Sequence, residues 1–164
     1  MTRGTICVDV DGTLTRDQFS RFGGLGPFGK VVWWGLRKAG IAERLMREAV
    51  PDVLAREWLR LLHDMGYRIL IVTARQERYR AITEAWLAHH CFVYDALDMR
   101  RPGEDIAAHK IAVARRSAGC VMFLDDTHEI CREVAKLGED APLVIEATDW
   151  RIVATVLAAL TKEV

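Results

Sequence analysis

The stretch ICVDVDGT, residues 6–13, decides the fold of this chain and suggests its chemistry. Its apolar part, Ile6 to Val8, is short and is typical of a buried strand. Asp9 and Asp11 stand at positions i and i+2, so their carboxylates project to the same side of that strand. Two neighbouring negative charges at the end of a hydrophobic strand are unfavourable unless a cation shares them or one is neutralised. A metal-assisted site in which Asp9 is the nucleophile is one explanation.

The composition favours a single folded domain. The chain has 164 residues, of which 51% are hydrophobic, so it is long enough to bury a core. Its formal net charge is zero, but basic residues dominate residues 12–47 and acidic residues dominate residues 125–146. A basic region beside a carboxylate cluster suits an anionic substrate held next to a divalent cation. The alternative is charge scattered over solvated helix faces.

The cysteines and the apolar stretches indicate a cytoplasmic enzyme. The four cysteines contain no CxxC pair, and three lie in or just before apolar runs, which favours buried, reduced thiols. No secretory hydrophobic region follows Met1. The most apolar stretch, residues 25–41, is interrupted by Lys30, Arg37 and Lys38, so we expect no membrane span.

Strands and helices alternate along the chain. Strands are predicted at residues 5–10, 67–72, 91–94, 121–124 and 143–145. One or two short helices are predicted within residues 30–49, and longer ones at 51–65, 75–89, 105–116, 129–137 and 150–160. Residues 22–29 are rich in turn formers and are predicted to be a loop. The alternation predicts an α/β fold with a mainly parallel sheet covered by helices on both faces.

Polar residues follow three of the predicted strands where each strand ends. They are Asp9, Asp11, Gly12 and Thr13 after the first, Thr73, Ala74 and Arg75 after the second, and Asp125 and Asp126 after the fourth. Because ligands of such sheets bind beyond the carboxyl ends of the strands, we expect these residues to converge in one site.

In this ordered set of motifs the chain resembles the haloacid-dehalogenase-like (HAD) superfamily of phosphohydrolases. The DxDGT motif corresponds to residues 9–13, and the apolar strand ending in Thr or Ser corresponds to residues 69–73. The helix lysine corresponds to Lys110, and the apolar strand ending in two aspartates corresponds to residues 121–126. The resemblance covers nearly the whole chain. It implies a three-layer, Rossmann-like fold and a phosphatase, that is, a hydrolase of phosphoric monoesters.

The resemblance also implies catalytic roles. Asp9 would attack phosphorus and form an aspartyl-phosphate, and Asp11 would protonate the leaving oxygen and then deprotonate the hydrolytic water. Thr73 would hydrogen-bond a phosphoryl oxygen, and Lys110 would neutralise another while restraining Asp9. The alternatives are that both aspartates only cap a strand end, that Thr73 is a helix N-cap and that Lys110 is a solvated lysine.

A Mg²⁺ cofactor is implied in the same way. Its ligands would be Asp9, the main-chain carbonyl of Asp11, and Asp125 or Asp126, with waters completing the octahedron. The ion would screen the nucleophile from the phosphate and stabilise charge on the transferring oxygens. Which of Asp125 and Asp126 contacts the metal stays open, and the other would cap the next helix.

The insertion points of the superfamily leave no room for a large cap domain here. We expect a single catalytic domain over residues 1–164, with a loop and a small helical flap at about residues 14–50. A nearly open site would admit a bulky substrate or be closed by another subunit. The aromatic segment 25–41, which contains Trp33 and Trp34, is a candidate lid or homo-oligomer interface. Ordinary packing against the sheet is the alternative.

A second resemblance concerns the substrate. Residues 94–105, before Lys110, resemble the segment that precedes the catalytic lysine in polynucleotide kinase-type phosphatase domains, which remove 3′-phosphates from nucleic-acid ends. Residues 83–87 resemble the same group and also small nucleotidases. The candidate substrate-binding residues are therefore Gly12, Thr13, Ala74, Arg75, Arg100 and Arg101. The alternative is a polar loop with surface arginines. The five histidines have no metal-ligand spacing and are expected at the surface or at helix ends.

Three functions follow from these patterns. The first is a Mg²⁺-dependent phosphomonoesterase acting on nucleic-acid 3′-ends or nucleotides. The second is the same enzyme acting on a small phosphorylated metabolite. The third is a non-catalytic binding or assembly module that docks its aromatic segment to a partner or a membrane surface. The complete set of carboxylates, threonine and lysine argues against the third.

Overall fold

A single parallel sheet forms the centre of the molecule. The computed structural model describes residues 3–16, 40–117, 119–139 and 141–161. The sheet has the strand order β3-β2-β1-β4-β5, and every pairing is parallel. The strands are β1 (Thr5–Val8), β2 (Arg68–Gln76), β3 (Ala96–Arg100), β4 (Cys120–Asp125) and β5 (Leu143–Glu146). The α/β fold that the sequence predicts is therefore confirmed.

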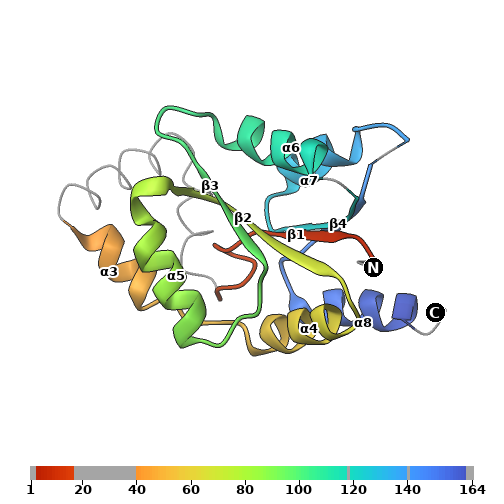
Figure 1. Ribbon diagram of the computed structural model, residues 1–164, viewed down its shortest axis with the longest axis horizontal. Coiled ribbons are helices and arrows are strands. Elements are labelled where there is room, and N and C mark those ends of the chain that lie inside the picture. The colour runs from red at the N-terminus through yellow and green to blue at the C-terminus, as the bar shows by residue number, and fades with distance from the viewer. Residues whose placement is uncertain (1–2, 17–39, 118, 140, 162–164) are drawn as a thin grey trace.

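Helices cover both faces of this sheet (Figure 1). One face carries α6 (Ile106–Arg116) and α7 (His128–Ala135), and the other carries α4 (Val53–Asp64), α5 (Arg80–His89) and α8 (Trp150–Thr161). A short helix, α3 (Ile41–Arg47), packs against α5, and a 3₁₀ turn, η1 (Glu77–Tyr79), precedes α5. The molecule is thus a three-layer sandwich.

The chain reverses its direction of travel across the sheet at β1. Strand β1 pairs with β2 on one side and with β4 on the other. Val8 lies beside Ile71 of β2 and beside Leu124 of β4, and the Asp9 amide donates to the Leu124 carbonyl at 2.9 Å. A crevice forms beyond the strand ends at such a switch point. The sheet therefore brings the residues after β1, β2 and β4 to one edge.

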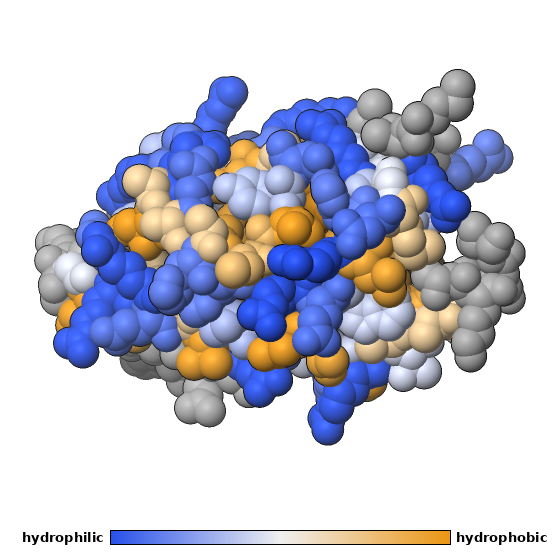
Figure 2. All heavy atoms as spheres, turned by 60° about the horizontal axis from the view of Figure 1, so that its bottom comes forward, coloured by the Kyte–Doolittle hydropathy of each residue, from blue (hydrophilic) through white to orange (hydrophobic). Residues whose placement is uncertain are grey.

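The exposed side of α4 and α8 carries mixed polar and apolar side chains, as is common on the surface of folded proteins. Figure 2 shows hydrophilic side chains interspersed with apolar ones on the face that these helices form at the bottom of Figure 1. Helix α4 begins after Asp52, whose carboxylate accepts from the Ala55 amide. Its buried residues are Ala55, Leu59 and Leu62, spaced four and three apart. Leu61 lies outside this buried face, with an exposed fraction of 46%.

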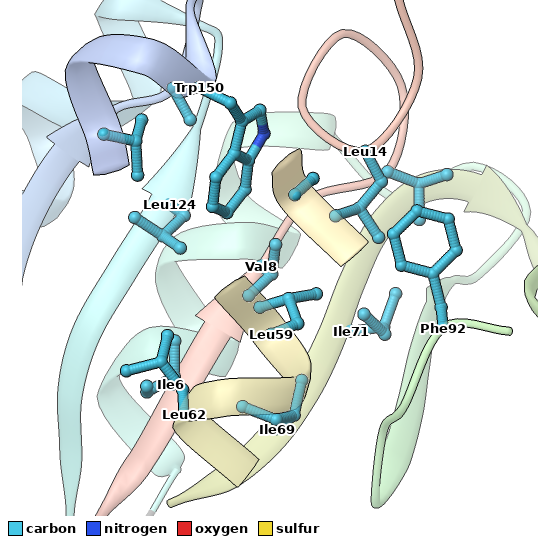
Figure 3. Close-up of a cluster of buried hydrophobic side chains, with 14 of the residues drawn as sticks. Ile6, Val8, Leu14, Leu59, Leu62, Ile69, Ile71, Phe92, Leu124 and Trp150 are labelled. Atoms are coloured by element: carbon cyan, nitrogen blue, oxygen red, sulfur yellow. The ribbon is translucent and has the colours of Figure 1, made fainter. Parts of the chain in front are cut away.

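The buried side of α4 packs against β1, β2 and β4 (Figure 3). Apolar side chains from these elements form one cluster, which includes Ile6, Val8, Leu59, Leu62, Ile69, Ile71 and Leu124. Trp150, at the start of α8, joins the same cluster, and its indole nitrogen donates to the Thr13 carbonyl at 2.6 Å. The core therefore also fixes the loop that follows β1.

The third strand lies later in the chain than the sequence predicts. Residues 91–94 are not a strand, because Cys91 has a φ of 57° and Phe92 packs against Trp86 at a ring-centroid distance of 5.3 Å. Strand β3 alternates apolar and polar residues from Leu97 to Arg100, as suits a strand at the sheet edge. The strand predicted at residues 91–94 is therefore wrong, because a continuous apolar run marks a central strand better than a half-exposed edge strand.

The helix predicted at residues 75–89 also starts later. Strand β2 continues to Gln76, which pairs with Arg100 after an irregularity in the β2–β3 register. Helix α5 begins only at Arg80, after η1. Arg75 is therefore a strand residue, and its side chain is buried.

The insertion between β1 and β2 is described only at its two ends. Thr15 and Pro51 form an antiparallel bridge, so these ends lie side by side. Residues 17–39 lie outside the described part of the chain, and with them the predicted 22–29 loop and most of the aromatic segment 25–41. The 14–50 flap and the single-domain organisation stay predictions. Within the described residues, no helix is long and apolar enough to cross a membrane.

Candidate active site

A buried lysine joins two buried aspartates at the carboxyl edge of the sheet. Lys110 Nζ lies 2.8 Å from Asp9 Oδ1 and 2.6 Å from Asp125 Oδ2. Asp9 follows β1, Asp125 ends β4, and Lys110 reaches them from α6. All three are at most 3% exposed, which excludes a solvated lysine and simple exposed strand caps.

A third carboxylate completes an acidic cluster. Carboxylate oxygens of Asp9, Asp125 and Asp126 all lie within 4.8 Å of one another. Gly12 allows this approach, because it has a φ of 90° and a Cβ at this position would lie 2.0 Å from Asp126 Oδ2. The glycine of the DxDGT motif therefore lets the loop after β1 lie against Asp126.

The cluster carries more negative than positive charge. Burial raises the pKa of Asp9 well above its usual value, and Asp125, Asp126 and Asp11 raise it further against the opposing effect of Lys110. Burial and the neighbouring Asp125 raise the pKa of Asp126 to about 6. Burial opposes the charge of Lys110, but Asp9 and Asp125 outweigh it and raise the pKa of this lysine. An additional cation would relieve this imbalance, and carboxylate oxygens are the donors that Mg²⁺ prefers.

The two aspartates of the C-terminal pair have different surroundings. Asp125 Oδ1 accepts from the Thr127 amide at 3.0 Å, and its Oδ2 accepts from Lys110. Among the residues that the structure describes, the Asp126 carboxylate makes one long hydrogen bond, in which its Oδ1 accepts from the Thr127 hydroxyl at 3.5 Å. The carboxylate of Asp126 therefore has weaker hydrogen bonding than that of Asp125 and is more accessible to a further ligand.

Asp11 points away from this cluster to a buried arginine. Arg75 Nε lies 2.9 Å from Asp11 Oδ2, and Arg75 Nη2 lies 2.6 Å from Asp11 Oδ1. The same guanidinium donates to the Thr83 hydroxyl at 3.3 Å and lies 6.0 Å from the centroid of the Trp86 ring. The structure thus places Arg75 behind Asp11, where it orients that carboxylate. The sequence had offered Arg75 as a phosphate contact.

Two threonines of the motifs are buried at the same edge. Thr73 is fully buried in β2, and its hydroxyl accepts from the Arg75 amide at 3.2 Å. It is not a helix N-cap, because it lies within β2 and the next helical turn, η1, begins only at Glu77. Thr13 is 1% exposed, and among the described residues its hydroxyl oxygen has no hydrogen-bond partner. The Gly12 amide already donates to the Thr15 hydroxyl at 3.0 Å.

Two arginines, at the end of β3 and directly after it, lie outside this cluster. Arg100 donates to the main-chain carbonyls of Ala74 and Glu104 and so ties the end of β2 to the loop before α6. Arg101 is exposed, and its amide donates to the Glu104 carboxylate. Among the described residues neither arginine contacts the acidic cluster.

A polar cavity that no sequence pattern predicts adjoins the loop after β1. Its volume is about 450 Å³, and Gly12 and Thr13 form part of its wall. The rest of the wall includes Arg16, Asp52, Asp149 and Arg151, from segments far apart in the chain. Arg16 belongs to the basic region noted in the sequence, whereas nothing local marks Arg151.

Solved structures share this fold. No protein-family model matches the chain, and no curated protein matches it. A chain of the Pnkp1/Rnl/Hen1 complex superposes with a TM-score of 0.63 and 18% identity, over 88% of this chain and 46% of that chain. A phospho-aspartyl intermediate analogue of phosphoserine phosphatase gives a TM-score of 0.59 and 17% identity, over 95% and 99%. The class C acid phosphatase from Bacillus anthracis with tungstate bound gives 0.52 and 14%, over 91% and 69%.

These comparisons define the class of fold. The chain has the HAD-like α/β fold, as its motif order predicts, and it spans less than half of the matched chain of the Pnkp1/Rnl/Hen1 complex. Because the identities are low, the comparisons establish the fold and leave activity and substrate to be inferred from the site.

The raised pKa of Asp126 predicts a pH-dependent effect on stability. An acid whose pKa is raised by folding stabilises the protein below its ordinary pKa and loses that contribution as pH rises through about 6. In chelator, Asp126→Asn should therefore raise the melting temperature above pH 6 and have little effect near pH 4 (roughly the ordinary Asp pKa). Thermal melts across this range test the effect. Glu57→Gln, an exposed change on α4, is the control. A melting temperature of Asp126→Asn that is raised equally at both pH values would contradict the prediction.

The ion pair of Arg75 with Asp11 predicts that one substitution lowers the stability of the fold strongly. Arg75→Gln leaves the Asp11 carboxylate without its cation, and removal of one partner from a buried ion pair costs about 3–5 kcal/mol. Arg75 is almost fully buried, although Asp11 is partly exposed, so we expect the lower end of that range. Denaturant unfolding measures the loss. Arg60→Gln, an exposed change on α4, is the control and should shift the free energy of unfolding by less than about 0.5 kcal/mol. Equal losses in the two variants would show that the Arg75–Asp11 ion pair contributes little to stability.

Proposed function

We propose that the chain is a Mg²⁺-dependent phosphomonoesterase that forms an aspartyl-phosphate on Asp9. The supporting observation is the buried contact of Lys110 with both Asp9 and Asp125, beside Asp126. A scaffold or binding module would gain nothing from burying three carboxylates around one lysine, since unpaired buried charge destabilises a fold. The same arrangement suits a reaction that moves a phosphoryl group with several negative oxygens.

The proposed metal site consists of Asp9, Asp125 and Asp126, with the main-chain carbonyl of Asp11. When bound, Mg²⁺ supplies charge that keeps the carboxylates ionised and neutralises phosphoryl oxygens. Asp126 is the better candidate for direct ligation, because both oxygens of Asp125 already accept hydrogen bonds. Asp125 then holds Lys110 in place.

Each remaining residue has a separate task in this proposal. Asp9 supplies the attacking oxygen, and Lys110 fixes its orientation at 2.8 Å while neutralising charge on the phosphoryl group. Asp11 exchanges the proton with the leaving group and with the hydrolytic water. Both oxygens of Asp11 accept bonds from Arg75, so one must leave the guanidinium before it takes part in that exchange. The buried hydroxyls of Thr73 and Thr13 are candidate donors to phosphoryl oxygens.

Two substrate classes enter the proposal. Nucleic-acid 3′-ends or nucleotides are supported by the resemblance of residues 94–105 and by structural similarity to a chain of the Pnkp1/Rnl/Hen1 complex. A small phosphorylated metabolite is supported by similarity to phosphoserine phosphatase, which extends over nearly all of both chains. A cytoplasmic location, a small flap at residues 14–50 and self-association through residues 25–41 remain predictions from the sequence.

The decisive experiment measures phosphate release from matched substrates. The panel contains oligonucleotides with 3′- or 5′-phosphates, mononucleotides and sugar phosphates, each with Mg²⁺ or with chelator. We expect release only with Mg²⁺ and none from Asp9→Asn, because an amide is not a nucleophile. A preference for 3′-ends, with a steep decrease in added salt, would select nucleic acid. A preference for small esters would select a metabolite. Release that is unchanged in Asp9→Asn would refute the covalent mechanism.

The assignment of Asp11 predicts a trapped intermediate. Asp11→Asn cannot take a proton from water, so the aspartyl-phosphate on Asp9 should persist and turnover should fall by about 10²–10⁴-fold. Intact-protein mass spectrometry after brief exposure to substrate should detect the added phosphoryl group. Asp9→Asn is the matched control and should not gain that mass. Normal turnover in Asp11→Asn would remove Asp11 from the proton transfer.

A further inference from the structure

A buried histidine beside the candidate active site has a ring nitrogen that makes no hydrogen bond within the described part of the chain. His109 is 2% exposed, which corrects the expectation that every histidine lies at the surface or at a helix end. Its Nδ1 lies 3.3 Å from Glu104 Oε2. Its Nε2 is buried and makes no hydrogen bond within the described residues. Buried polar atoms of this kind are rare in folded proteins, so Nε2 calls for an explanation.

A carboxylate oxygen of Asp98 faces this nitrogen. Asp98 Oδ1 lies 3.6 Å from His109 Nε2, which is too long for a hydrogen bond. The other oxygen of Asp98 is held by Arg116 Nη2 at 2.5 Å. In each side chain one polar atom is held by a partner: Glu104 holds His109 Nδ1, and Arg116 holds Asp98 Oδ2. The other two polar atoms, His109 Nε2 and Asp98 Oδ1, face each other.

This pattern is the one that metal ligands adopt. A histidine that binds a metal usually donates its other ring N–H to a carboxylate, and a carboxylate ligand is itself hydrogen-bonded. Glu104 is placed to accept from His109 Nδ1–H, and Arg116 holds Asp98. Glu104 therefore favours the tautomer that leaves the lone pair on Nε2.

The separation of the two atoms fits a tetrahedral ion. With Zn–N and Zn–O bonds of about 2.1 Å, two ligand atoms 3.6 Å apart subtend an angle of about 120° at zinc. Burial lowers the pKa of His109, although Glu104 and Asp98 oppose this effect, so the ring is available as a neutral ligand at neutral pH.

A cavity beside the two groups offers room for the other ligands. His109 and Asp98 form part of its wall, and its volume of about 490 Å³ is large enough for the waters that would complete a coordination shell. The charged groups in its wall come from η1, the start of α5, β3, the loop after β3, and α6. They are Glu77, Arg80, Asp98, Arg101, Glu104, His109 and Arg116.

We propose that His109 Nε2 and Asp98 Oδ1 bind a zinc-like transition metal ion, with waters as the other ligands. This site is distinct from the oxygen cluster of Asp9, Asp125 and Asp126, which has no nitrogen donor. A bound ion joins β3 to α6, the helix that carries Lys110. The proposal does not depend on phosphatase activity, and its test uses binding alone.

The test follows the ring nitrogens of individual histidines by NMR in isotope-labelled protein. The protein is held near neutral pH with excess Mg²⁺, and Zn²⁺ is added. We expect the His109 Nε2 resonance to shift and to saturate. A site-resolved signal is needed because Cys7 and Cys120, whose sulfurs are 3.3 Å apart, are an alternative zinc-binding pair. Zinc held only by those thiols would leave His109 unchanged and would overturn the proposal.

Three variants complete the test. Asp98→Asn should weaken the His109 response by at least about 10-fold, and Glu104→Gln should weaken it by about 10–100-fold, as the loss of an outer partner does. His128→Gln, which removes an exposed histidine 2.9 Å from Glu146, should leave the response unchanged. A response of wild-type affinity in Asp98→Asn would overturn the proposal. Should a variant fail to fold, the wild-type titration still decides, because absence of a His109 shift in excess Zn²⁺ refutes the site.

Discussion

The rest of the site depends on one interaction, the contact of Lys110 with Asp9 and Asp125. Buried charges are tolerated only when they are paired and hydrogen-bonded, and here one ammonium group serves two carboxylates from different strands. The contact needs β1 and β4 to be neighbours and α6 to lie across them, so it depends on the order of the whole sheet. The fold and the proposed chemistry are therefore linked: the residues proposed to react are the ones whose buried negative charges favour a bound cation.

The switch point at β1 explains why these residues meet. A parallel sheet that grows outwards in both directions from its central strand leaves the loops after β1 and β4 on opposite faces of one crevice. Gly12 then allows close approach to Asp126, and Trp150 holds the other side of the loop through the Thr13 carbonyl. The loop after β1 is thus held from two directions, and the proposed catalysis would benefit from such fixed geometry.

The sequence predicts these parts because they rest on local patterns. The strands that became β1, β2 and β4 are short apolar runs followed by polar residues, which identifies both the strands and the reactive edge. The pairing of Arg75 with Asp11 joins residues 64 positions apart, so no local pattern predicts it, and a contact of Arg75 with substrate stays a prediction. Strand β3 alternates in polarity because it lies at the edge, and the prediction went to the more apolar residues 91–94 instead. His109 looked like a surface residue because its burial depends on β3.

Helix α6 connects the two cation sites that the structure suggests. Consecutive helix residues differ in direction by about 100°, so His109 and Lys110 face different neighbours from adjacent positions. Lys110 reaches the oxygen cluster beneath the sheet edge, and His109 reaches Asp98 on β3. An all-oxygen cluster favours Mg²⁺, whereas a nitrogen and an oxygen at tetrahedral spacing favour zinc-like ions. The two sites would therefore select different metals through ligand type alone. An ion between His109 and Asp98 would also restrain the helix that positions the lysine on which the first site depends.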